Sequence, residues 1–273
     1  MISADMEGAT GVTWTADVQV GTEQWQRFRH MFTSDVNACV AGLFDGGATD
    51  VLVNEAHSSQ RNILLEDLDT RARMLTGRHK PLSMMQGIDS GVDGVVFLGY
   101  HTAAGVEGVL SHTYLPNQIT GVWLDGVHAS EGRLNAALAA EYGVPVLLVT
   151  GDDLTCVDAG DYAPGAEQVA VKECVSRYAA ICTPPQITAA RITSAADAGM
   201  ARAGRYDAAP ATTHRIEVEF DAAHLAAAAA VVPTVDQVHV RRVGFDAASM
   251  TEAMKAFKVV TAIASGAVEG SYG

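Results

Sequence analysis

Short apolar runs alternate with longer segments of helical periodicity over the first two thirds of the chain. The apolar runs are nearly uninterrupted, which is typical of strands buried on both faces of a parallel sheet. They are residues 50–54 (DVLVN), 94–100 (GVVFLGY) and 144–150 (VPVLLVT), and residues 2–4 form the stub of a first strand. The pattern predicts an α/β fold with a mostly parallel sheet flanked by helices.

Two segments between these strands have the spacing of helices. Residues 22–44 carry apolar side chains three or four positions apart, which indicates a helix with one buried face. Residues 131–142 are the second helix, and Ser130 is a suitable N-cap for it. Residues 120–124 are predicted as a strand that turns back into a hairpin at the Asp-Gly pair 125–126.

The pattern changes after the Pro-Pro pair at 184–185. Helices are predicted at residues 187–203, 222–231 and 247–264, and strands at 215–220 and 238–243. We therefore expect an α/β domain over residues 1–190 and a smaller α+β region over residues 191–273. The Ala-rich helices of that smaller region are compatible with packing between subunits.

Composition and charge narrow the class of protein. The chain has 273 residues, of which 48% are hydrophobic and 18% charged, and this composition is globular and excludes disorder. No apolar run reaches the roughly 18 residues that cross a bilayer, and the N-terminus lacks the features of a secretory signal. A net charge of −14 argues against a nucleic-acid partner, because a phosphate backbone requires a basic face. We expect a cytoplasmic protein that binds neither membranes nor nucleic acid.

The four cysteines are scattered along the chain, at positions 39, 156, 174 and 182. None forms a C-x-x-C pair, so a zinc finger is not supported, and the spacing fits a reducing compartment. Nothing around these residues suggests an activated thiolate.

Carboxylate and imidazole side chains follow three of the predicted strands. Asp5 and Glu7 come after the first strand, and His57 and His101 come after the next two. Because the carboxyl ends of parallel strands meet at one edge of a sheet, these side chains are expected to converge there. Each has an ordinary alternative, a capping or solvated loop for the acidic pair and a hydrogen-bonded structural role for either histidine. Together they indicate a divalent metal such as zinc.

Two further residues are ambiguous on the sequence alone. Glu131 opens a predicted helix, where the helix dipole also stabilises a carboxylate without any metal. His112 lies in a Gly-containing segment after His101, the kind of loop that can carry a catalytic group. The pair Asp152-Asp153 follows a buried strand and is expected to cap a helix or support a ligand rather than bind metal.

Several motifs have a recognisable order and spacing. They are SADMEG at 3–8, VLVNEAHS at 51–58, FLGYH at 97–101, LSHT at 110–113, SEGRLNA at 130–136, VPVLLVTGDD at 144–153 and VAVKECVSR at 169–177. Each is weak alone, but together they are specific. Over nearly its whole length the chain resembles the zinc-dependent D-aminopeptidase family of metallopeptidases, the type associated with dipeptide-transport operons.

The resemblance implies a dinuclear site with two Zn²⁺ ions per subunit. Asp5 would be shared between the ions, and the coordination would be completed by Glu7, His57, His101 and Glu131. His112 falls on the position of the catalytic histidine. The resemblance also implies hydrolysis of N-terminal D-amino acids such as D-Ala from short peptides, and assembly into a closed homo-oligomer, with a decamer as the expected form.

Two other functions stay open. The first is a two-metal hydrolase of another amide or ester. The second is a metal-stabilised binding protein without catalysis, and His112 argues against it because a structural zinc site needs no free histidine beside it. Nucleotide binding is not supported, since no glycine fingerprint follows a strand and opens a helix.

Overall fold

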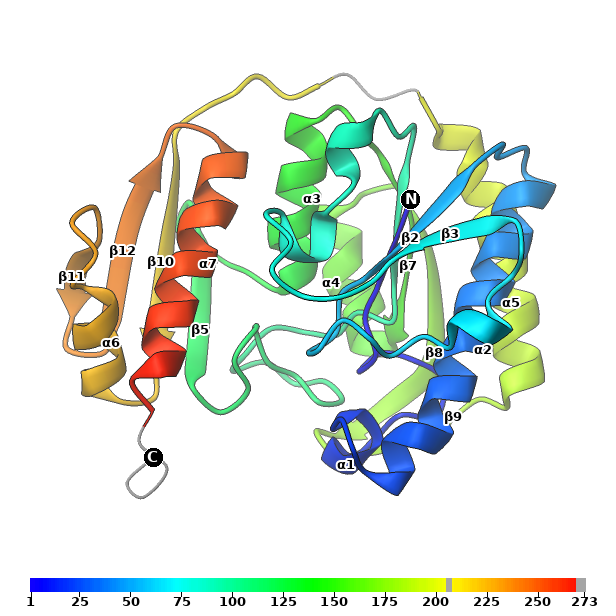
Figure 1. Ribbon diagram of the computed structural model, residues 1–273, viewed down its shortest axis with the longest axis horizontal. Coiled ribbons are helices and arrows are strands. Elements are labelled where there is room, and N and C mark those ends of the chain that lie inside the picture. Colours follow the sequence, from blue (N-terminus) through cyan, green and yellow to red (C-terminus); the bar gives the residue numbers. More distant parts are fainter. Residues whose placement is uncertain (205–207, 269–273) are drawn as a thin grey trace.

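The computed structural model describes residues 1–204 and 208–268, which form two β-sheets and the helices around them (Figure 1). The first sheet has the strand order β3-β2-β1-β4-β7-β8-β9, in which only β9 runs antiparallel to its neighbour. Its strands are β1 (Ile2–Ala4), β2 (Val51–Glu55), β3 (Ala72–Leu75), β4 (Val95–Leu98), β7 (Val146–Asp152), β8 (Glu167–Ser176) and β9 (Ala179–Cys182). This mostly parallel sheet confirms the predicted fold class.

Helices cover both faces of this sheet. They are α1 (Thr15–Val18), α2 (Glu23–Asp45), α3 (Glu131–Glu141), α4 (Asp153–Tyr162) and α5 (Pro185–Gly199), with single 3₁₀ turns at Leu65–Asp67, Ser83–Met85, Ile88–Ser90 and Met200–Arg202. In β4, Val96 and Leu98 belong to the core under α2 and α5, whereas Val95 and Phe97 face the core shared with α3. The strand is therefore buried on both faces, as its uninterrupted apolar run predicts.

The contact between α2 and α5 depends on a close backbone approach (Figure 1). A Cβ atom added at Gly42 of α2 would lie 2.1 Å from the carbonyl oxygen of Thr193 in α5. Only glycine fits there, and this contact holds the two helices against the sheet. Among the helices of residues 1–204 and 208–268, none is both long and apolar enough to cross a membrane.

The second sheet is antiparallel, with the order β11-β12-β10-β5-β6. Its strands are β5 (Ile119–Leu124), β6 (Val127–His128), β10 (His214–Phe220), β11 (Asp236–His239) and β12 (Arg242–Ala247). Helices α6 (Ala223–Ala229) and α7 (Met250–Gly266) pack against it, and α7 also contacts α3 (Figure 1). The sheet takes two strands from the middle of the chain, and the domain division at residue 190 stays a prediction.

One predicted strand is wrong. Residues 238–243 are not a single strand but the end of β11, a tight turn and the start of β12, because His239 pairs with Arg242 and the chain reverses between them. Val238 and Val240 are both exposed, so their apolar pattern does not report burial. The hairpin predicted at residues 125–126 is confirmed by the pairing of β5 with β6.

Candidate metal centre

The structure brings together the six side chains selected from the sequence, namely Asp5, Glu7, His57, His101, His112 and Glu131. Strand β1 lies between β2 and β4, so the loops after these three strands meet at one edge of the sheet. These loops supply the acidic pair and two histidines, the first turn of α3 supplies the glutamate, and the loop before β5 supplies the last histidine. All six are buried, with exposed fractions between 2% and 9%.

Asp5 occupies the middle of this cluster. Its Oδ1 lies 3.5 Å from His57 Nδ1 and its Oδ2 lies 3.5 Å from His101 Nε2. Glu7 Oε2 is 2.8 Å from His57 Nδ1, and Glu131 Oε1 is 3.8 Å from His101 Nε2. Donor atoms form three groups, and those of each group lie within 4.8 Å of one another. Two of the groups share Asp5, one with Glu7 and His57 and the other with His101 and Glu131, and the third joins Glu7, His101 and His112.

His112 lies beside both groups. Its Nε2 is 3.7 Å from Glu7 Oε1 and 4.0 Å from Glu131 Oε1. Its ring stacks on the ring of His101 with a centroid distance of 4.2 Å. His112 therefore faces the same space as the carboxylates but is farther from them than His57 is.

Each of the three histidines is oriented through one ring nitrogen. The partners are the carbonyl oxygens of Val18 for His57 Nε2 (2.9 Å), Thr102 for His101 Nδ1 (3.0 Å) and Leu110 for His112 Nδ1 (2.8 Å). Because a carbonyl only accepts hydrogen bonds, that nitrogen donates, and the other nitrogen faces the carboxylates, where either a proton or a metal ion can lie between them. This is the arrangement in which proteins present histidine to a metal.

The electrostatics of the cluster also fit bound cations. Burial lowers the pKa of His101, but the carboxylates of Glu131 and Asp5 outweigh burial and raise that pKa to about 10. Burial raises the pKa of Glu131 to about 7. Burial also opposes ionisation of Asp5, yet the imidazoles of His101 and His57 beside it hold its pKa well below the usual range. Within the described residues the buried His101 Nε2 has no hydrogen-bond partner. Nitrogen and oxygen donors around excess buried negative charge suit zinc.

Two glycines allow the Asp5–Glu7 loop to lie against the loop after β4. A Cβ atom at Gly8 would lie 2.0 Å from the carbonyl oxygen of Tyr100, and a Cβ atom at Gly99 would lie 2.1 Å from that of Asp5. Gly99 also has a φ of +72°, which favours glycine. The glycine that closes the SADMEG motif therefore permits the close approach that places Glu7.

Lys172 of β8 fixes the backbone of the same loop, and the sequence pattern did not indicate this residue. Its side chain is fully buried, and Nζ donates to the carbonyl oxygens of Glu7 (2.6 Å), Ala9 (3.0 Å) and Val12 (2.6 Å). Burial lowers its pKa to about 8, so the amine stays protonated at neutral pH. The available signal was a single lysine inside the apolar run VAVKEC.

Asp152 supports the His112 loop rather than the metal cluster. Its side chain caps α4 by accepting hydrogen bonds from the backbone nitrogen (2.7 Å) and hydroxyl (2.6 Å) of Thr155. The other carboxylate oxygen accepts from the backbone nitrogen of Val109 (2.7 Å). The expectation of a capping role for this residue is confirmed.

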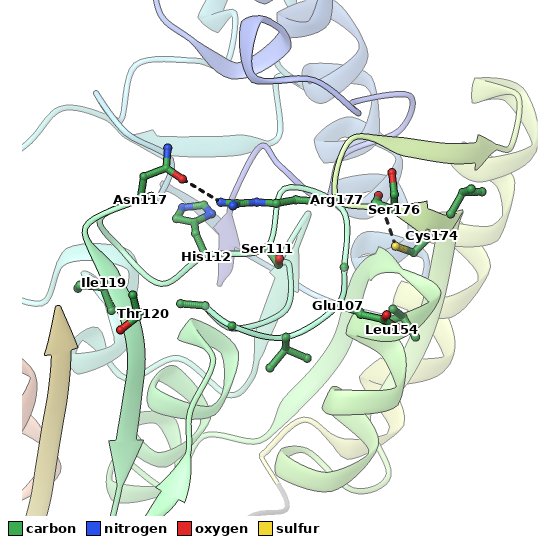
Figure 2. Close-up of a pocket in the computed structure, with 15 residues that line it drawn as sticks. Glu107, Ser111, His112, Asn117, Ile119, Thr120, Leu154, Cys174, Ser176 and Arg177 are labelled. Carbon is green, nitrogen blue, oxygen red and sulfur yellow. Dashed lines mark hydrogen bonds between the residues drawn. The ribbon is translucent and has the colours of Figure 1, made fainter. Parts of the chain in front are cut away.

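Two cavities meet at His112. The smaller, of about 570 Å³, is lined by the acidic side chains of the cluster together with His57. The larger, of about 750 Å³, is lined by Ser111, Asn117 and Arg177 and does not include the acidic residues of the cluster (Figure 2). His112 lines both cavities. The smaller also contains the cationic side chains of Arg78, Lys80 and Lys258, and the larger contains Glu107 as well as Arg177.

Comparison with known proteins places this geometry in a family. The family model of peptidase family M55, described as D-aminopeptidase, matches residues 1–259. A D-aminopeptidase of Bacillus subtilis (strain 168) is 38% identical over 184 residues, which make up 67% of each chain. The structure of the Zn-dependent D-aminopeptidase DppA from Bacillus subtilis, described as a self-compartmentalizing protease, matches with a TM-score of 0.91 and 32% identity over 97% of both chains.

These matches extend over most of the sequence and almost the whole fold. They confirm the resemblance inferred from the motifs, and with it the predicted class of enzyme, a peptidase. The chain belongs to the D-aminopeptidase family, peptidase family M55.

Proposed function

We propose that the protein is a zinc-dependent aminopeptidase that removes N-terminal D-amino acids, such as D-Ala, from short peptides. The observation that carries the proposal is the convergence of three buried carboxylates on three histidines, each of which turns one ring nitrogen toward them. In this proposal the Zn²⁺ ions, two per subunit, are held by a shared Asp5 and by Glu7, His57, His101 and Glu131. The zinc dependence of the Bacillus relative supports the choice of metal.

The chain's own residues perform the remaining tasks of hydrolysis. When bound, a pair of divalent ions supplies Lewis-acid polarisation of the scissile carbonyl. The carboxylates of the smaller cavity attract the protonated amino group of the substrate. His112 acts at the scissile bond as proton carrier or nucleophile, because its Nδ1 is anchored to Leu110 and its Nε2 faces the cluster.

The D-preference is expected to appear directly in kinetics. The purified zinc-loaded protein should hydrolyse D-alanine p-nitroanilide with a kcat/KM about 10- to 200-fold above that for the L-enantiomer, the range that pocket shape usually supplies. The measurement is a panel of D- and L-aminoacyl nitroanilides and short peptides. Equal rates for the two enantiomers would contradict the D-specificity. If neither enantiomer were hydrolysed, the proposed aminopeptidase activity itself would be contradicted.

The proposed ligands are expected to control metal content. Elemental analysis should give two zinc ions per chain for the wild type, fewer than one for Asp5→Ala, which loses the shared carboxylate, and about one for His57→Ala. His30→Ala is the matched control, because His30 is an exposed histidine of α2 outside the cluster. Wild-type zinc content in both Asp5→Ala and His57→Ala would contradict the ligand assignment.

We also propose that the protein assembles into a homo-oligomer, as the self-compartmentalizing relative suggests. The edge hairpin β8–β9 exposes Val175, Tyr178 and Ile181, and the ring of Tyr178 contacts the exposed Trp14. Apolar side chains gathered on an edge strand commonly mark an interface. The decamer and the cytoplasmic location stay predictions.

A further inference from the structure

The larger cavity beside His112 has one basic side chain of the Lys or Arg type among its described lining residues, that of Arg177 (Figure 2). Arg177 lies in the turn between β8 and β9, and its carbonyl oxygen accepts a hydrogen bond from the backbone nitrogen of Leu110 (2.8 Å). The turn is thus tied to the loop that carries His112. The arginine is therefore held at a fixed place relative to the reaction centre.

The guanidinium of Arg177 is not engaged by a carboxylate. Its side chain makes one weak hydrogen bond, from Nη2 to Asn117 Oδ1 at 3.5 Å, and its Cζ lies 5.5 Å from the centroid of the Tyr178 ring. Its Nε is buried without a hydrogen-bond partner within the described residues. The acidic residue of this cavity, Glu107, lies beside Leu154, away from the guanidinium (Figure 2). A guanidinium with free donors pointing into a cavity is suited to bidentate binding of a carboxylate.

The position of His112 indicates which part of a peptide substrate would lie near Arg177. An aminopeptidase holds the substrate's amino group on one side of the scissile bond and the rest of the peptide on the other. Here the carboxylates of the smaller cavity suit the amino group, His112 lies at the junction, and the larger cavity remains for the leaving part. Its volume of about 750 Å³ falls within the usual range for small-molecule ligands, about 300–1,000 Å³.

We propose that Arg177 binds the C-terminal carboxylate of the substrate, so that short peptides with a free carboxyl end are the preferred substrate class. This inference rests on the proposed aminopeptidase function. It assigns to the larger cavity the recognition of the leaving peptide. Length selection follows, because a longer peptide places its carboxylate beyond the fixed guanidinium.

The test compares one dipeptide in two forms, D-Ala-Gly and its C-terminal amide D-Ala-Gly-NH₂. Both contain the same scissile bond, and only the first has the carboxylate. The wild type is expected to prefer the free acid by about 10- to 100-fold in kcat/KM, the usual effect of a charge-assisted hydrogen bond. In Arg177→Gln this acid-to-amide ratio should fall to about 1. Arg177→Lys should retain an intermediate ratio, because lysine keeps the positive charge but lacks the paired donors of the planar guanidinium.

The matched control is a second arginine near the cluster, Arg78. Arg78 lines the smaller cavity, and Arg78→Gln is expected to keep the wild-type acid-to-amide ratio. A ratio near 1 in the wild type, or a ratio lost in Arg78→Gln but kept in Arg177→Gln, would overturn the inference. Thermal unfolding of each variant identifies one that fails to fold, and Arg177→Lys then decides.

The nitroanilide substrate separates this inference from the proposed function, because it has no carboxylate. Wild-type hydrolysis of D-alanine p-nitroanilide together with an acid-to-amide ratio near 1 would remove the role of Arg177 alone. If the wild type hydrolysed none of the D-substrates, both the proposed aminopeptidase function and this inference would be contradicted. Equal losses on the acid and the amide in both Arg177→Gln and Arg177→Lys would mean that the side chain only supports the His112 loop, and this too would overturn it.

Discussion

Replacing His112 with alanine is expected to lower kcat/KM by about 100- to 10,000-fold, the usual contribution of a positioned proton carrier, while both zinc ions remain bound. The expectation follows from the geometry of the ring. Its Nδ1 is anchored to the carbonyl oxygen of Leu110, and its Nε2 faces the cluster at 3.7 Å from Glu7 Oε1 and 4.0 Å from Glu131 Oε1. Both donor groups that share Asp5 are complete without His112, which belongs only to the third group, with Glu7 and His101.

The informative measurement for His112→Ala combines steady-state kinetics with elemental analysis of the same preparation. His101→Ala is the matched comparison, because its ring stacks on that of His112 but belongs to the proposed ligands, and it should lose zinc and activity together. Full hydrolysis by zinc-loaded His112→Ala would remove this residue from the chemistry. A loss of zinc in proportion to the loss of activity would make it a ligand instead.

Part of the site could be predicted because it depends on local sequence. Asp5, His57 and His101 each follow a strand with a clear apolar pattern, and the three strands are neighbours in the sheet. A parallel sheet then brings their side chains to one edge. For these residues, a periodicity and one topological rule were enough to predict convergence.

The remaining site residues depend on packing that the sequence pattern does not report. Glu131 reaches the cluster because α3 packs on the face of the sheet that contains Val95 and Phe97. His112 reaches it through the long loop between β4 and β5. On the sequence alone both residues were ambiguous, and only the resemblance to a family selected them. The join of β5 to β10 across more than ninety residues, seen where Val122 pairs with Val218, was likewise out of reach of local patterns.

Lys172 and Arg177 were missed because the pattern of β8 is mixed. The strand mixes exposed, intermediate and buried positions without a regular alternation, and its last two residues are exposed, so its apolar signal is weak. A lysine within it would ordinarily be taken as solvated, since lysine is almost never fully buried unless its charge is paired. The burial of Lys172 depends on carbonyl groups near the N-terminus of the chain, those of Glu7 and Val12.

The largest expected effect on stability is that of Lys172→Met, which keeps the apolar stem and removes the ammonium. The carbonyl oxygens of Glu7 and Val12 would lose the donor that lies 2.6 Å from each of them. An unsatisfied buried group costs about 1–3 kcal/mol, so the free energy of unfolding should fall by about 3 kcal/mol. Urea denaturation of the metal-free protein measures this without a contribution from zinc binding.

The same substitution should weaken the metal site, because Lys172 fixes the backbone of the loop that carries Glu7. Supporting partners of metal ligands typically change metal affinity by about 10- to 100-fold, so zinc should be lost to a competing chelator at a correspondingly lower chelator concentration. Lys255→Met is the control, since Lys255 is exposed on α7 and should change the free energy of unfolding by less than about 0.5 kcal/mol. If Lys172→Met matched Lys255→Met in both unfolding and zinc retention, the loop would hold its shape through Gly8 and its backbone contacts alone.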